Sequence, residues 1–255
     1  MPDRSMPRNI KNSFELASDH YGYRLPYPKA LFHEVSRYLK FDERTSILDL
    51  CCGQGQLSLG FADRIGRAVA TDFSEQMIAS APRHERVDYV LHDVNAPEPL
   101  PDRYRDTRFS HIVVGRAIHG IDQRSLKVVA DRNLEREGRI LIFGSGFTQD
   151  NPWLPAFTAL QKQYEKGERK LDFLGTEKLA DAGFLNECEA YAEFKAAASV
   201  DFMTRYALSF GRSTERISDD LDDFQVKLKD VLAPYMTGSR LIGDAIGWAT
   251  MFRRR

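Results

Sequence analysis

Cysteine is scarce in this chain of 255 residues: there are three, and two of them, Cys51 and Cys52, are adjacent. Such a set excludes the disulfide framework of small secreted domains, and no Cys/His spacing is typical of a zinc site, so we expect no metal. Long apolar runs are also missing. None reaches the roughly 18 residues of a membrane helix, and the N-terminus lacks the apolar stretch of a signal peptide. We therefore expect a cytoplasmic protein without a membrane partner.

An excess of charge of either sign is absent as well. Lys plus Arg total 36 and Asp plus Glu total 37, which gives a net charge of −1. This balance offers no general attraction to nucleic acid, so no nucleic-acid partner is expected. Hydrophobic residues make up 42% of the chain, enough for one large α/β domain with a full core.

The most informative stretch combines a buried strand with a glycine turn. Residues 47–50 are apolar except for Asp49, and Gly53 and Gly55 precede an amphipathic helix expected at 56–65. Glycine allows positive φ and close approach of a ligand, and the start of the helix directs free N–H groups at that ligand. The pattern indicates the nucleotide site of a doubly wound α/β fold.

A second strand supplies the other half of this site. Residues 67–71 are mostly apolar and end at Asp72, which follows the glycine turn by about 20 residues. An acidic residue at this spacing can accept hydrogen bonds from both ribose hydroxyls of a nucleoside. Ser74 then fits the N-cap of a helix expected at 75–80.

The residues of the turn favour one class of nucleoside. Ser58 stands where a nicotinamide site would have its third glycine, and the Gly-Lys-Ser/Thr of a phosphate-binding loop is absent. Asp49 would repel a phosphate but could hold an ammonium group, directly or through water. S-adenosylmethionine joins adenosine to an amino-acid tail and fits this pattern.

The same residues resemble a known family. Residues 49–55, Asp-Leu-Cys-Cys-Gly-Gln-Gly, resemble the first motif of class I S-adenosylmethionine-dependent methyltransferases, usually Asp-Leu-Gly-Cys-Gly-x-Gly. Residues 70–78 resemble the second motif, and the likeness extends over about 24–144. It implies a Rossmann-like, doubly wound α/β fold with a mostly parallel seven-stranded sheet, a helical N-terminal lid and a helical insert before the last strand.

The resemblance also implies a set of cofactor residues. Asp72 would hold the ribose, and Asp93 would lie near the adenine amino group. Cys51 replaces the first glycine of the motif, which a small side chain can tolerate. The residues assigned to S-adenosylmethionine, and to its product S-adenosylhomocysteine, are Asp49, Cys51, Gly53, Gly55, Asp72, Phe73, Met77, Asp93, Val94 and Gly115.

The segment before the first motif resembles the lead-in of small-molecule methyltransferases of the trans-aconitate methyltransferase-like (methyltransferase type 11) group. We expect residues 1–40 to form a tail, disordered over 1–11, and a lid helix at 29–39. Residues 41–255 would form the methyltransferase domain, with a helical cap insert around 199–240. The residues expected to contact the acceptor are Tyr21, Arg24, Tyr27, His119, Arg205 and Arg212.

Several of these acceptor residues have a plainer interpretation. The aromatic lead-in could be an ordinary packing cap, and the arginines could be surface residues bonded to the acidic run at 219–223. Guanidinium groups suit a carboxylate, so the arginines favour a carboxylate-bearing acceptor. His119 follows the fourth strand, at the edge where open α/β sheets bind ligands, and it could act as a general base or only bond the backbone.

The remaining strands follow from short apolar runs. We expect the third to the seventh at 87–91, 109–114, 139–144, 188–195 and 243–252, with a helix at 123–134 and a turn at Glu137-Gly138.

These patterns predict an enzyme that transfers a methyl group from S-adenosylmethionine to a small molecule. A nucleic-acid methyltransferase is disfavoured, because the Pro-Pro motif of base-amino methylation is missing after the fourth strand. Family residues are lost at Ser110, Gly120 and Glu137. A catalytically silent protein that only binds the cofactor therefore stays open, as does a homodimer.

Overall fold

A seven-stranded sheet forms the centre of the molecule. The computed structural model describes residue 17 and residues 19–165 and 176–255, so the tail expected at 1–11 lies outside the described residues. The strand order is β3-β2-β1-β4-β5-β7-β6, and only β7 runs antiparallel to its neighbours. The strands are β1 (Ser46–Leu50), β2 (Arg67–Asp72), β3 (Val87–Leu91), β4 (Phe109–Gly115), β5 (Leu134–Phe147), β6 (Phe184–Ala198) and β7 (Leu241–Arg254).

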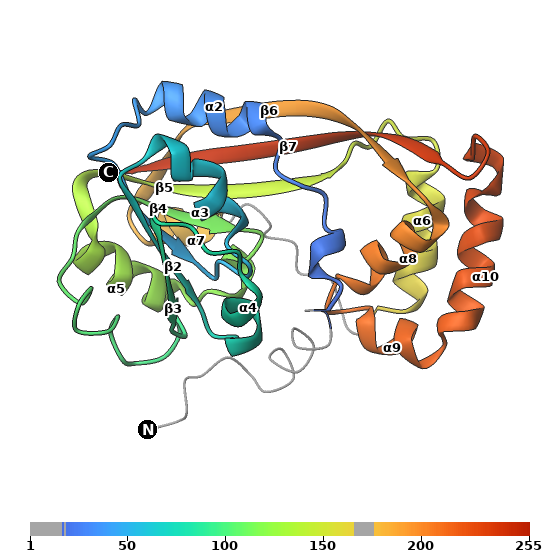
Figure 1. Cartoon of the computed structure of the whole chain (residues 1–255), viewed down its shortest axis with the longest axis horizontal. Helices are drawn as coiled ribbons and strands as arrows, with labels where there is room; N and C mark the ends of the chain where they lie inside the picture. Colours follow the sequence, from blue (N-terminus) through green and yellow to red (C-terminus); the bar gives the residue numbers. More distant parts are fainter. Residues whose placement is uncertain (1–16, 18, 166–175) are drawn as a thin grey trace.

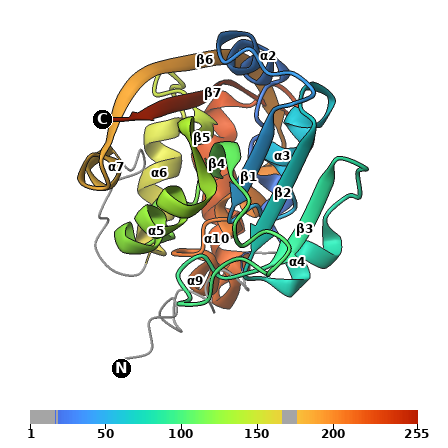
Figure 2. The same ribbon diagram turned by 90° about the vertical axis from the view of Figure 1, so that its left-hand side faces the viewer.

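Helices cover both faces of the parallel part of the sheet. One apolar layer joins the sheet to α2 (Lys29–Tyr38) and α3 (Gln56–Phe61), and another joins it to α5 (Gln123–Asn133) and α7 (Thr176–Asp181). Figure 2 shows these helices on either side of the strands. The helix α4 (Glu75–Ser80) begins as expected, since the Ser74 hydroxyl accepts a hydrogen bond from the N–H of Met77. The predicted doubly wound fold is confirmed.

Three strands are longer than the sequence predicted. The turn expected at Glu137-Gly138 lies inside β5, which begins at Leu134. The pairing of β4 with β5 shifts register between Phe109 and His111. Gly138 sits at this irregularity, because an added Cβ would lie 2.7 Å from the carbonyl of Ser110. β5 therefore continues through Glu137 and Gly138, although their sequence is typical of a turn.

β6 and β7 are also longer than predicted, since the sequence indicated them at 188–195 and 243–252. They pair antiparallel from Phe184 beside Arg254 to Ala198 beside Leu241. β6 is an edge strand, and most of its side chains are exposed or half-buried. Polar residues such as Asn186 and Glu187 interrupt its apolar residues, so no continuous apolar run marks its bounds.

The far halves of β5, β6 and β7 reach into a helical lobe (Figure 1). Between β6 and β7 the chain forms the predicted insert, with α8 (Val200–Leu208), α9 (Thr214–Asp219) and α10 (Leu221–Leu232). Together with α6 (Leu154–Gln163) these helices enclose a separate apolar core that includes Phe157, Met203, Phe224 and Leu228.

The N-terminal region contacts both the sheet and the helical insert. Leu31, Phe32 and Val35 of α2 are buried in the core against the sheet, so α2 is an integral covering helix. The segment before α2 descends between the sheet and the insert, through the short helix η1 (Tyr21–Tyr23) (Figure 1). This segment, rather than α2, lies beside the carboxyl ends of the parallel strands.

Candidate active site

The turn after β1 has an unusual backbone. Cys51, Gly53 and Gly55 all have positive φ, at 55°, 55° and 78°. An added Cβ at Gly53 would lie 3.3 Å from the ring of Tyr21, and one at Gly55 would lie 2.3 Å from the hydroxyl of Tyr89. The two glycines therefore meet both the backbone and the space requirements of the turn. Cys51 holds the same conformation at a cost in strain.

Asp49 is a buried carboxyl group with half of its hydrogen-bonding capacity unused. Ser58 donates its N–H and its hydroxyl to Oδ2, at 3.2 Å and 2.8 Å. Oδ1 is buried and has no partner among the described residues. Burial raises the pKa of Asp49 to about 7, against the opposing effect of the bonds from Ser58. A buried carboxylate in this condition lacks a cation or donor.

Asp72 holds the glycine turn in place. Its Oδ2 accepts from the N–H of Gly53 at 2.8 Å, and its Oδ1 accepts from the N–H of Ser74 at 2.9 Å. Each carboxylate oxygen can accept a further bond. Burial raises the pKa of Asp72, and the charge of Asp93 raises it further. The structure thus brings Asp49 and Asp72, two carboxylates predicted to bind the cofactor, to one edge of the sheet.

The other predicted cofactor residues surround the same edge. Phe73 directly follows Asp72 and is half-buried, and Met77 and Val94, both later in the chain, are buried. Gly115 ends β4, and an added Cβ there would lie 2.6 Å from the hydroxyl of Tyr27.

Tyr21 and Tyr27 close the front of this edge. They line a small cavity with Asp49, Cys51, Cys52, Gln56, Leu57 and Gly115. The cavity measures about 10 Å³, which is room for one water at most. The lead-in segment therefore fills the space in front of the glycine turn, and a cofactor can enter only if Tyr21 moves aside.

Arg116 lies directly after β4 and was not among the residues predicted to form the site. It has positive φ, at 57°. Its guanidinium group donates to the carbonyl of Leu25, to the hydroxyl of Ser145 and to the side-chain oxygen of Gln56. Its carbon lies 4.3 Å from the centre of the Tyr27 ring. The signal that could have identified Arg116 is a cationic residue immediately after a buried strand, at the ligand-binding edge.

Arg24 joins the lead-in segment to the insert. Its Nε and Nη2 donate to the carbonyl of Ser209, at 3.2 Å and 2.8 Å, and its guanidinium lies 3.7 Å from the centre of the Phe210 ring. Burial lowers the pKa of Arg24 to about 10, and the charge of Arg116 lowers it further. The two guanidinium groups are thus close enough to affect each other.

His119 lies in the short helix η3 (Ile118–Gly120) at the mouth of the site. Its side chain reaches solvent, yet protein surrounds it on most sides. This partial burial lowers the pKa of His119 below 6.5, and the cations Lys178, Arg24 and Arg212 lower it further. The imidazole is therefore neutral at pH 7.

The two arginines of the insert differ in their placement. Arg205 binds Asp201 on its own helix at 3.1 Å and lies over the ring of Tyr23, so its partner is not the acidic run at 219–223. Arg212 is exposed on the loop before α9, near enough to His119 to affect its pKa. Arg205 thus faces Tyr23 of η1, whereas the charges of Arg24 and Arg212 both act on His119.

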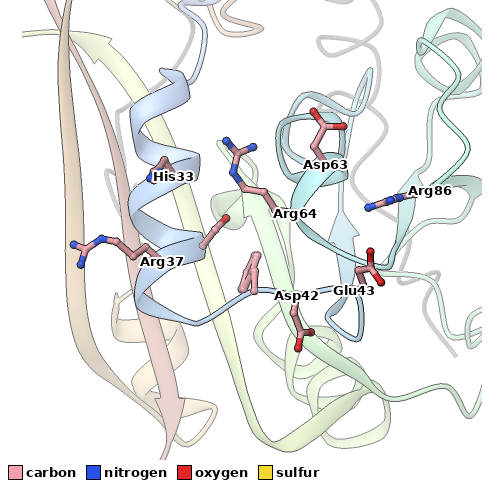
Figure 3. Close-up of a pocket in the computed structure, with 9 residues that line it drawn as sticks. His33, Arg37, Asp42, Glu43, Asp63, Arg64 and Arg86 are labelled. Carbon is pink, nitrogen blue, oxygen red and sulfur yellow. The ribbon is translucent and has the colours of Figure 1, made fainter.

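A second hollow lies away from this site, near the amino ends of β1 and β3 (Figure 3). It has a volume of about 410 Å³ and is lined by charges of both signs. Several of these groups already have partners: Arg37 binds Glu34, and Arg86 donates to the carbonyls of Ala62 and Ile65. Since doubly wound sheets bind ligands at the opposite edge, this hollow is not the predicted site.

Comparison with known proteins agrees with the fold and with the first motif. Residues 47–135 match a family model described as a methyltransferase domain. The structure is similar to that of a candidate type II methyltransferase from Anaeromyxobacter dehalogenans, with a TM-score of 0.70, 23% identity, and 91% of this chain and 97% of that chain covered. No curated protein matches the sequence.

Two further similar structures are S-adenosylmethionine-dependent methyltransferases in complex with S-adenosylhomocysteine. The protein from Geobacter sulfurreducens has a TM-score of 0.52 and 18% identity, with 99% of this chain and 100% of that chain covered. The protein from Thiobacillus denitrificans has a TM-score of 0.51 and 15% identity, with 95% and 98% covered. The prediction of a methyltransferase domain is confirmed for residues 47–135, and the finer likeness to the trans-aconitate group stays a prediction.

Proposed function

We infer that this protein, whose residues 47–135 carry a methyltransferase domain, transfers a methyl group from S-adenosylmethionine to a carboxylate-bearing small molecule. The observation that carries this inference is the buried, unpartnered Oδ1 of Asp49 beside two positive-φ glycines. A ligand with an ammonium group would supply the missing partner. The two similar structures that hold S-adenosylhomocysteine support the choice of cofactor.

The residues present fit this cofactor. Asp49 would hold the ammonium group, Gly53 and Gly55 would let the ligand approach the backbone, and Asp72 would accept from the ribose hydroxyls. The cofactor supplies an electrophilic methyl group on a sulfonium. The protein then has to position the acceptor and exclude water. Tyr21, Tyr27 and the insert would provide that closed, aromatic surrounding.

A small acceptor fits the covering of the site better than a macromolecule does. The lead-in segment and the insert meet in front of the strand ends, where Arg24 binds Ser209. Arg24 and Arg212, and Arg205 after a rearrangement away from Asp201, would provide cations for an acceptor carboxylate. Among the described residues, no helix is both long enough and apolar enough to span a membrane.

Asp72→Ala should weaken binding of S-adenosylhomocysteine by about 1–3 kcal/mol, the worth of charge-assisted hydrogen bonds. The loss has two sources, since Asp72 would bind the ribose and also holds Gly53. Calorimetric titration measures it. The control is Asp88→Ala, because Asp88 lies in the neighbouring strand β3 and accepts its hydrogen bond from Tyr104 of the following loop. Unchanged affinity in folded Asp72→Ala would remove Asp72 from the site.

His119→Ala should raise the KM for the acceptor several-fold and leave the pH profile of single-turnover methyl transfer unchanged. A general base must become a cation, and Lys178, Arg24 and Arg212 oppose a positive charge at His119. An ionised carboxylate needs no base, so positioning is the expected role. A loss of roughly 10²–10⁴-fold, with disappearance of an acid limb below pH 6.5, would instead make His119 the general base.

A further inference from the structure

A buried carboxyl group and a half-buried guanidinium group of opposite charge border the small cavity in front of the glycine turn. Asp49 lines the cavity from β1, and its Oδ1 has no partner in the part of the chain that the structure describes. Arg116 lies behind Gly115, which also lines the cavity, and it bonds Gln56 on the same wall. Tyr27 also lines the cavity, and its ring centre lies 4.3 Å from the guanidinium carbon of Arg116.

Among the described residues, Arg116 has no counter-ion. Its partners are a backbone carbonyl, a side-chain amide, hydroxyl groups and an aromatic ring, all of them neutral. Within residues 19–165 and 176–255 no carboxylate lies within 4 Å of its guanidinium. Its Nε is shielded from solvent and makes no hydrogen bond to any described residue.

A half-buried guanidinium whose shielded Nε–H has no partner and which has no anion beside it is costly to keep. The cost is increased by Arg24, whose charge repels that of Arg116. Structural arginines avoid this cost by pairing with a carboxylate, as Arg139 does with Glu187 in this chain, at 3.0 Å. The positive φ of Arg116 adds backbone strain at the same residue, and strain of this kind gathers at functional sites.

We propose that Arg116 is a carboxylate-binding residue of the active site. The arrangement favours the carboxylate of the cofactor's amino-acid tail. This tail is a zwitterion, so its ammonium group could pair with Asp49 while its carboxylate pairs with Arg116. The acceptor's carboxylate is the other source of the same chemistry. The inference rests on the proposed function, since it assigns a ligand group within that same site.

Calorimetric titration with three probes tests this assignment. S-adenosylhomocysteine carries both charges of the tail, its decarboxylated analogue keeps only the ammonium, and 5′-methylthioadenosine has no tail. Arg116→Gln should bind S-adenosylhomocysteine roughly 10- to 100-fold more weakly, the effect of losing a charge-assisted hydrogen bond. It should bind the other two probes as the wild type does. Arg116→Lys should recover part of the loss, because lysine keeps the charge without the planar fork.

A matched control is Arg86→Gln, since Arg86 also donates to backbone carbonyls but lies at the other edge of the sheet. This variant should bind all three probes as the wild type does. Thermal unfolding of each variant shows whether it is folded.

The outcomes separate the possible failures. If Arg116→Gln binds S-adenosylhomocysteine normally but raises the KM for the acceptor at least tenfold, Arg116 binds the acceptor's carboxylate. Equal losses for all three probes would mean that Arg116 only supports the fold, and the inference would be overturned. So would unchanged binding of all probes together with an unchanged KM. A wild type that binds none of the probes would overturn the proposed function itself.

Discussion

Gly53→Val is expected to abolish measurable binding of S-adenosylhomocysteine while leaving the protein folded. A β-branched residue disfavours the positive φ at this position, and its Cβ would occupy the side of the turn that now faces Tyr21, at 3.3 Å. The strain costs about 1–3 kcal/mol, which a typical stability of about 5–15 kcal/mol can absorb. Calorimetric titration and thermal unfolding measure the two effects separately.

Gly238→Val is the matched control for this strain. Gly238 has φ of 61°, and an added Cβ there meets nothing within 4 Å. It should lose similar stability and keep the wild-type affinity. Cys51→Gly provides a second comparison, because glycine adopts the same positive φ without strain, and binding should persist. Binding that survives in folded Gly53→Val would place the cofactor elsewhere.

Affinity for S-adenosylhomocysteine is expected to fall steeply as the pH is lowered through 7. Burial raises the pKa of Asp49 to about 7 in the free protein, and only the ionised carboxylate can pair with the ligand's ammonium. Affinity should therefore weaken roughly tenfold for each pH unit below 7. The decline would follow protonation of Asp49 while the ligand keeps its positive charge.

Asp49→Asn tests the origin of this pH dependence. The variant should bind roughly 100-fold more weakly at pH 8, because the charge is lost, and its affinity should vary little between pH 6 and 8. Ser58→Ala is a milder comparison. It removes one donor to Asp49, which should raise the pKa of Asp49 and move the decline to higher pH. A pH-independent affinity in the wild type would exclude Asp49 as the partner of the ammonium group.

The parallel half of the fold was predictable because its signals are local. After β1 the chain turns into a helix through residues of positive φ, and Gly53 and Gly55 mark that point. The bounds of β3 and α4 also agree with the prediction: the polar residues His92 and Asp93 follow β3, and Ser74 caps α4. Central parallel strands are buried on both faces, so they appear in the sequence as continuous apolar runs.

The antiparallel half was less predictable because its stability comes from distant partners. β6 and β7 pair over their full lengths, from Phe184 with Arg254 to Ala198 with Leu241, so residues without an apolar pattern are still held in the sheet. The continuation of β5 through Gly138 depends on a register shift against β4. Such tertiary pairing overrides local turn chemistry.

The site was only partly predictable, because some of its residues come together through contacts between distant parts of the sequence. Asp49 and Asp72 belong to motifs with fixed spacing, whereas Arg116 and Arg24 become neighbours only when the lead-in segment lies against the insert. Arg116 bonds Leu25, which is 91 residues away in the sequence, and Arg24 bonds Ser209, which is 185 residues away. No local pattern carries that information.

The most direct test of the account is transfer of a ¹³C-labelled methyl group from S-adenosylmethionine to a pool of small carboxylic acids, followed by mass spectrometry. The account predicts labelled small products in molar excess over the wild-type enzyme, and none with Gly53→Val. It also predicts no label on nucleic acid supplied in the same reaction. Tight binding of S-adenosylhomocysteine without transfer to any acceptor would contradict the account and identify a catalytically silent binding protein.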